Sequence, residues 1–198
     1  MFLLEVVLRR FVVLTVSTQF VFWWVQWGSA EDWNRFRGPN GSGVAASLAL
    51  PEQLSDSSIR WKVPVQPGNS SPVIVGGKLF LSSFSEDQRN LHCFRAEDGE
   101  LLWTQSILQA RTETATPPNG PATSSVACDG ERAVAFFPDT GLLACTMNGE
   151  QLFVADIGPF SSMHGLSSSP LLHNDTIILT VDQLSDPYIV ALDASTGE

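Results

Sequence analysis

The chain has 198 residues, of which 43% are hydrophobic and 10% aromatic, and it carries a formal net charge of −10. This acidic balance excludes nucleic acid and anionic membranes as partners, because both repel negative charge. No acidic run is long enough to indicate a dedicated cation site. The negative charge therefore indicates a well-solvated acidic surface.

Residues 1–30 are predicted to be a signal peptide. Arg9 and Arg10 precede an apolar run over residues 11–27, and Gly-Ser-Ala at residues 28–30 supplies the small side chains where a signal peptidase cuts. The alternative is an uncleaved membrane anchor, because the run is close to the ~20 residues that span a bilayer. Polar residues dilute the run and the cleavage site follows at once, so we favour cleavage and a secreted or periplasmic protein with no membrane contact afterwards.

The mature chain divides into an extended N-terminal segment, residues 31–58, and a repeat region, residues 59–198. Removal of the leader leaves 9 basic and 20 acidic side chains, a net charge of −11. Three Gly turns close three copies of one strand pattern, at Ala96–Glu100, Thr146–Glu150 and Ala194–Glu198. Their spacing of about 50 residues is the period expected of propeller blades.

Each copy has the same order of elements before its Gly turn: strand, hairpin, strand, loop, strand. The hairpin positions hold Gly, Asn or Asp, which tolerate the positive φ angles of tight turns. First strands are expected at 70–75, 123–128 and 168–173, second strands at 78–81, 133–137 and 176–181, and third strands at 91–94, 142–145 and 189–192. Apolar residues in both alternating registers indicate sheets that are buried on both faces.

A fourth strand is expected after the Gly turn, marked by an aromatic residue at a constant offset: Trp103 in the first copy and Phe153 in the second. Such rings are expected to fill the wedge between neighbouring blades. The third copy would have its fourth strand beyond Glu198, whereas Ile59–Val63, which contain Trp61, resemble a fourth strand with nothing upstream to pair with. The predicted fold is therefore all-β: a partial β-propeller of about three four-stranded antiparallel blades in an incomplete ring.

The length of the chain without its leader, 168 residues, is short for a closed propeller. Four to eight blades of about 40 to 50 residues each need more chain. Unpaired sheet edges also invite aggregation or pairing with another chain. We therefore expect a fragment of a longer propeller, with a ring completed by several copies as the rarer alternative.

The repeats resemble the pyrroloquinoline-quinone-like, or quinoprotein-type, β-propeller repeat. The resemblance is carried by Ser-Ser-Pro-Val at residues 70–73, Gly-Gly-Lys-Leu-Phe at 76–80, and Leu-His-Cys-Phe-x-Ala-x-Asp-Gly-Glu-Leu-Leu-Trp at 91–103. Residues 32–43 resemble the segment before the first blade in large secreted bacterial members of this family. Those members are often described as similar to the propeller lipoprotein of the outer-membrane β-barrel assembly machinery. The resemblance covers nearly all of residues 32–198.

The resemblance implies two functions of different classes. Similarity to the barrel-assembly propeller implies a secreted, non-catalytic scaffold or interaction protein of the bacterial cell envelope, with protein partners and no cofactor. The alternative is a fragment of a quinone-dependent dehydrogenase, whose relatives hold PQQ with a calcium ion, a catalytic Asp and often a disulfide between adjacent cysteines. This chain has no adjacent cysteine pair, and none of its Asp or Asn residues matches a calcium site. A third interpretation is a non-functional remnant.

The three histidines are the best candidates for chemistry at neutral pH. His92 lies in an expected strand and His173 at a hairpin edge, whereas His164 lies in a loop before the third copy, where propeller loops gather near the central channel. None has a placed carboxylate or a second ligand, so structural roles are expected. We predict no catalytic, cofactor-binding or metal-binding residue in the chain.

The cysteines are expected to be structural as well. Cys93, Cys128 and Cys145 all occupy apolar strand positions, where a free cysteine behaves as a small buried hydrophobe. Cys93 and Cys145 fall on opposite faces of different blades, which argues against a disulfide between them. No nearby His or Lys pattern supports a reactive thiol.

Overall fold

The computed structural model describes residues 31–45 and 52–198, and the predicted signal peptide lies outside the described residues. Apart from one short 3-10 turn, η1 (Asp56–Ser58), the regular structure of the described part is β-strand. The strands are β1 (Val73–Val75), β2 (Lys78–Phe84), β3 (Gln88–Arg95), β4 (Leu101–Leu108), β5 (Ala127–Cys128), β6 (Arg132–Phe137), β7 (Gly141–Thr146), β8 (Gln151–Ala155), β9 (Leu171–His173), β10 (Thr176–Val181) and β11 (Tyr188–Asp193).

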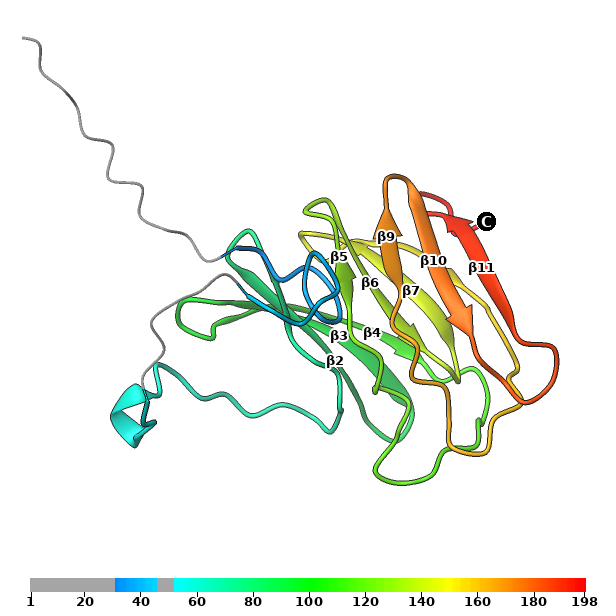
Figure 1. Ribbon diagram of the computed structural model, residues 1–198, viewed down its shortest axis with the longest axis horizontal. Helices are drawn as coiled ribbons and strands as arrows, with labels where there is room; N and C mark the ends of the chain where they lie inside the picture. Colours follow the sequence, from blue (N-terminus) through cyan, green and yellow to red (C-terminus); the bar gives the residue numbers. More distant parts are fainter. Residues whose placement is uncertain (1–30, 46–51) are drawn as a thin grey trace, which may run out of the picture.

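The strands form three antiparallel sheets that follow one another along the chain (Figure 1). The first has the order β1-β2-β3-β4, the second β5-β6-β7-β8, and the third, of three strands, β11-β10-β9. The first strands of successive sheets are in contact, β1 with β5 and β5 with β9, so the sheets diverge from a common line. The described part of the chain is therefore an open arc of three blades, as predicted (Figure 1).

The predicted strands are confirmed, with shifts at their ends. β10 begins and ends where the sequence predicts, whereas β2 extends three residues further, to Phe84. The first strands are shorter than expected, and β1 begins only after Pro72. Proline has no N–H to donate to a ladder, which keeps the residues before it out of the sheet.

The serines that precede the first strands join neighbouring sheets. The backbone N–H of Ser71 donates to Ser125 Oγ at 3.3 Å, and the N–H of Ser125 donates to Ser169 Oγ at 3.0 Å. The three residues occupy the same position in the three copies. The same hydrogen bond thus joins the first sheet to the second and the second to the third. This bond explains why a Ser-Ser pair recurs in each copy.

Two apolar cores hold the sheets face to face. The core between the first and second sheets contains the fully buried Phe80 and Leu91 opposite Phe137 and Leu143. The core between the second and third sheets brings together Val134, Phe136 and Leu142 with Ile177, Leu179 and Val181. Burying each such side chain contributes about 1.5–3 kcal/mol. Because both faces of the second sheet are covered, β6 and β7 are buried along almost their whole length.

An aromatic side chain from each fourth strand packs on the Gly turn of the next sheet. Trp103 of β4 lies over Gly149, where a Cβ atom would stand 2.7 Å from the indole, and Trp103 Nε1 donates to the Met147 carbonyl at 3.1 Å. Gly149 also has a φ of +88°, so glycine is required there for two reasons. Phe153 of β8 lies over Gly197 in the same way. The predicted filling of the wedge between blades is confirmed.

The segment Ile59–Val63, expected to resemble a fourth strand, is not a strand in the structure. Within the described residues no strand lies beside this segment to supply ladder hydrogen bonds, and the sequence likewise offers it no strand to pair with. Its aromatic residue nevertheless docks as predicted: Trp61 lies over Gly99, and Trp61 Nε1 donates to the Ala96 carbonyl at 3.0 Å. We call residues 59–66 the strap.

Part of the N-terminal segment is held on the first strands. The N–H and carbonyl groups of Trp33 pair with those of Ile74 in β1 at 2.8 and 2.9 Å. The next carbonyl, that of Asn34, accepts from the N–H of Cys128 in β5 at 2.9 Å. The segment therefore connects the first two sheets where they meet.

We expect Trp103→Ala to lower the free energy of unfolding by about 3–5 kcal/mol. The substitution removes the ring between two sheets and leaves the Met147 carbonyl with Lys78 Nζ as its donor in place of two donors. Urea denaturation followed by far-UV circular dichroism measures the change. Leu108→Ala, on the same strand but with Leu108 68% exposed, is the control and should change stability by less than about 0.5 kcal/mol. Equal stability of Trp103→Ala and wild type would place the ring outside the core.

Candidate functional site

Loops gather at one end of the three sheets, which we call the loop end. Because the strands alternate in direction, the connections over residues 109–126, 156–170 and 182–187 all leave the sheets at this end. They lie toward the lower right of Figure 1. Loops carried by a rigid scaffold are where binding residues are most often found.

Arg111 holds the first two of these loops together. Its guanidinium pairs with Glu113 at 3.0 Å and with Asp156 at 2.6 Å, and it donates to the carbonyls of Pro138 and Ile157. The guanidinium also lies 5.6 Å from the centre of the Phe160 ring. One side chain thus connects the loops that follow β4, β6 and β8.

His164 and its neighbours add further bonds between the loops. The side chains of Thr116 and Asn119 donate to the carbonyls of Met163 and His164 at 3.0 and 3.1 Å, and His164 Nδ1 lies 3.2 Å from Thr116 Oγ1. The N–H of Leu184, from the β10–β11 connection, donates to the Ser161 carbonyl at 2.8 Å.

Two large apolar side chains are exposed on these cross-linked loops. Met163 is 60% exposed and Leu184 is 67% exposed. We call Met163, His164 and Leu184 the loop-end patch. The structure therefore places His164 where loops gather, as predicted, whereas His173 lies exposed at the end of β9.

A buried ion pair lies beneath the loops. Arg89 Nε donates to Asp139 at 2.9 Å, and the two side chains are 4% and 7% exposed. The Asp139 carbonyl accepts from the N–H groups of Ala110 and Arg111 at 3.1 and 3.0 Å. The pair joins the first and second sheets. No sequence signal marks it, because its partners lie 50 residues apart.

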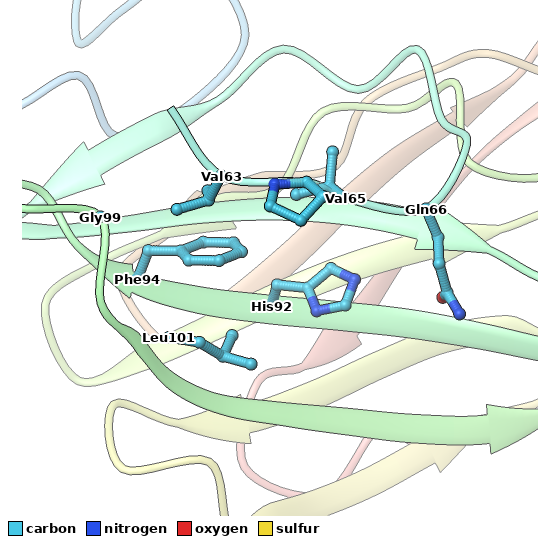
Figure 2. A pocket seen from close by; sticks show the side chains of 8 residues that line it. Val63, Val65, Gln66, His92, Phe94, Gly99 and Leu101 are labelled. Atoms are coloured by element: carbon cyan, nitrogen blue, oxygen red, sulfur yellow. The ribbon is translucent and has the colours of Figure 1, made fainter. Parts of the chain in front are cut away.

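A second candidate site is a hollow of about 530 Å³ on the outer face of the first sheet (Figure 2). His92 and Phe94 of β3 lie beneath the strap, which contributes residues 63–66, and Leu101 of β4 lies to the side. The hollow is lined mainly by apolar side chains, so it suits an apolar surface better than a charged ligand.

His92 is buried and held by two hydroxyl groups. Its Nε2 lies 2.7 Å from Ser83 Oγ and its Nδ1 lies 2.8 Å from Thr104 Oγ1. Desolvation lowers the pKa of His92, because burial disfavours the imidazolium. The Ser83–His92 pair has the order of a nucleophile and its base. However, Ser83 is 0% exposed and a hydroxyl rather than a carboxylate orients the imidazole, so the arrangement is structural.

The three cysteines are free and lie in one core. Cys93, Cys128 and Cys145 are all buried between the first and second sheets. Cys93 and Cys145 lie on opposite faces of their own sheets, as predicted. Because the two sheets are stacked, these two faces turn toward each other, and both cysteines lie in the core between them. Burial raises the pKa of Cys93 to about 11 and those of Cys128 and Cys145 to about 12. The thiols therefore stay protonated at neutral pH.

Three carboxylates at the loop end are already engaged by arginine side chains. The carboxylates of Glu113, Asp139 and Asp156 are each bound by a guanidinium. Over residues 31–45 and 52–198 there is no group of three or more His, Cys, Asp and Glu side chains placed to share a metal ion. Over the same residues, no helix has both the length and the apolar character required to cross a bilayer.

No protein-family model and no curated protein matches this chain. Among solved structures, the chain is similar to a quinohemoprotein alcohol dehydrogenase from Comamonas testosteroni, with a TM-score of 0.57 and 16% identity over 85% of this chain and 26% of that chain. It is also similar to a europium-containing methanol dehydrogenase, with a TM-score of 0.51 and 14% identity over 67% and 24% of the two chains. BamB from Moraxella catarrhalis gives a TM-score of 0.35 and 15% identity over 70% and 53%.

These similarities confirm the quinoprotein-type propeller fold that the repeats resemble. At 14% and 16% identity the shared property is the fold. The chain spans about a quarter of the length of the two dehydrogenases, 24% and 26%.

We expect the three thiols to be unreactive in the folded protein. With pKa values of about 11 and 12, almost no thiolate is present at about pH 8. Ellman's reagent should therefore label none of them quickly in buffer and all three in guanidinium chloride. A rapidly labelled thiol in the folded protein would show that at least one of these side chains is accessible.

We expect His92→Gln to make stability less dependent on pH between about 7.5 and 5.5. The pKa of His92 in the folded protein is below its ordinary value, so the unfolded chain binds the additional proton as the pH falls through about 6.5. Wild-type stability therefore decreases toward acid, whereas Gln does not titrate. Urea unfolding at both pH values measures the effect. The control is His173→Gln, at an exposed position, which should keep the wild-type dependence of stability on pH. If His92→Gln also kept that dependence, the lowered pKa of His92 would be contradicted.

Proposed function

We propose that this protein is a non-catalytic interaction protein of the bacterial cell envelope and that the loop-end patch is its binding surface. The observation that carries the proposal is the exposure of Met163 and Leu184, 60% and 67%, on loops that are tied together by hydrogen bonds. Large apolar side chains exposed together mark contact sites, and methionine adapts to the shape of a partner. Loops ordered in advance lose little entropy on binding.

The chemistry around the patch favours binding over catalysis. Arg111, Glu113 and Asp156 are engaged in ion pairs with one another that hold the loops together. His164 shares its Nδ1 with the Thr116 hydroxyl, a neutral group that gives the imidazole no charge partner. The residues of the loop end therefore support a rigid surface rather than a proton transfer.

We place the protein in the cell envelope because of its predicted signal peptide. We also propose that it works without a cofactor. A fragment of a quinone-dependent dehydrogenase is the alternative function, since two of the similar structures are alcohol dehydrogenases. That alternative requires ligands for a quinone and its cation. The exposed apolar patch requires only a protein partner with a complementary apolar surface, which is why we favour the interaction role.

We expect the immobilised protein to retain a specific protein from bacterial envelope extracts, and the double variant Met163→Asp/Leu184→Asp to retain it at least about tenfold less. Carboxylates in place of both apolar side chains would have to be desolvated in the complex. Quantitative mass spectrometry of the retained fraction gives the ratio.

The matched control for this experiment is Leu54→Asp. Leu54 is 82% exposed and lies next to η1, far from the loop end (Figure 1). The control should retain the same protein as wild type. Equal retention by wild type and the double variant, or no specific retention by wild type, would overturn the proposed binding surface.

A further inference from the structure

We propose that the partner of the loop-end patch is a cationic amphipathic segment of another protein. Its apolar side chains contact Met163 and Leu184, and its Lys or Arg side chains face Asp182 and Asp186. The inference rests on the proposed function, because it names the chemistry of the partner for the same surface.

The charge beside the patch comes from one connection. The loops over residues 114–126 and 157–170 contain no Asp, Glu, Lys or Arg side chain. In the β10–β11 connection, by contrast, Asp182 and Asp186 are each two residues from Leu184. Both aspartates are exposed, as Leu184 is. An exposed apolar side chain thus lies between two negative charges.

The β10–β11 connection is held in a fixed shape. Gln183 Oε1 accepts from the N–H of Ser161 at 3.1 Å, and Gln183 Nε2 donates to the Asp186 carbonyl at 3.2 Å. Asp186 has a φ of +52°, a conformation that Asp and Asn adopt more readily than most other residues with a side chain. The backbone that carries the two carboxylates is therefore ordered before a partner binds, which lowers the entropy cost of binding.

Neither of these two carboxylates holds the fold together. Over residues 31–45 and 52–198, no hydrogen bond or ion pair reaches either of them. Other aspartates of the third sheet do have such a role: Asp175 pairs with Arg132 at 3.1 Å, and Asp193 accepts from the N–H of Ser195 at 2.8 Å. Carboxylates without an internal partner are available to an external cation.

The surrounding charge favours the same partner. Arg89 and Arg111, the arginines at the loop end, are already engaged in the ion pairs described above. Residues 133–198 contain no Lys or Arg and eight acidic side chains. The surface around the patch therefore attracts a cationic segment and repels an anionic one. Such complementarity governs the association rate and the choice of partner, while the apolar contact slows dissociation.

Three synthetic peptides test the chemistry of the partner. Each contains Leu residues in a Gly-Ser background and differs only at four positions, which are all Lys, all Gln or all Glu. In fluorescence anisotropy at about 0.1 M salt, we expect the Lys peptide to bind at least about tenfold more tightly than the Gln peptide, and the Glu peptide to bind least. The advantage of the Lys peptide should disappear at about 1 M salt, where charges are screened. Equal binding of the Lys and Gln peptides would overturn the proposal.

Two matched variants locate the binding of the Lys peptide. Asp182→Asn/Asp186→Asn removes both charges and keeps a residue that tolerates positive φ, and it should lower the association rate about tenfold. Glu86→Gln/Asp87→Asn removes the same number of exposed carboxylates from the β2–β3 connection. This connection lies two sheets away, about 20 Å at the usual sheet spacing, beyond the Debye length of about 10 Å. The control should therefore bind like wild type. Equal weakening by both variants would show general attraction to an acidic protein and would overturn the proposal.

The protein retained from envelope extracts separates this inference from the proposed function. Its release by about 1 M salt, and its weaker retention by Asp182→Asn/Asp186→Asn, would support a cationic partner. Full retention by this variant and in high salt, together with loss by Met163→Asp/Leu184→Asp, would overturn the cationic partner and leave the binding surface intact. Met163→Ser/Leu184→Ser, which changes no charge, should raise the dissociation rate of the Lys peptide.

Discussion

An aromatic ring packed on a glycine turn sets the distance between successive sheets. The contact occurs three times, from Trp61, Trp103 and Phe153 onto Gly99, Gly149 and Gly197. A side chain on any of these glycines would enter the ring, and each turn also needs a positive φ angle. The spacing that results is the one at which the apolar faces of neighbouring sheets interdigitate. Both cores therefore depend on it.

Charged side chains hold the sheets at the opposite end. Arg89 and Asp139 form a buried pair between the first two sheets, and Arg111 connects three loops above it. Removing one member of a buried pair leaves an uncompensated charge, which costs far more than the intact pair contributes. The sheets are thus fixed at both ends. The loops between the strands become a rigid surface, and this rigidity is what makes an exposed apolar patch suitable for binding.

Most of the fold could be predicted because the repeat is redundant. Glycine turns, hairpin residues and alternating apolar strands recur in three copies, so an error in one copy is corrected by the other two. At Ile59–Val63 the same pattern resembles a fourth strand, and because this segment has no neighbouring strand in the described residues it forms no ladder. The candidate site was less predictable. The loops do not repeat, and the bonds of Arg111 and His164 join residues about 45 positions apart.

The sequence by itself determined the fold class, the strand order within each blade and the burial of the three cysteines, because local turn chemistry and side-chain alternation require only near neighbours. The tertiary structure alone decided which faces meet, which charges pair and which apolar side chains stay exposed. Opposite faces of Cys93 and Cys145 converge on one core only once two sheets are stacked. Met163 and Leu184 belong to separate loops that are joined by the hydrogen bond from the Leu184 N–H to the Ser161 carbonyl. Such contacts depend on distances across the fold, and a linear pattern does not contain those distances.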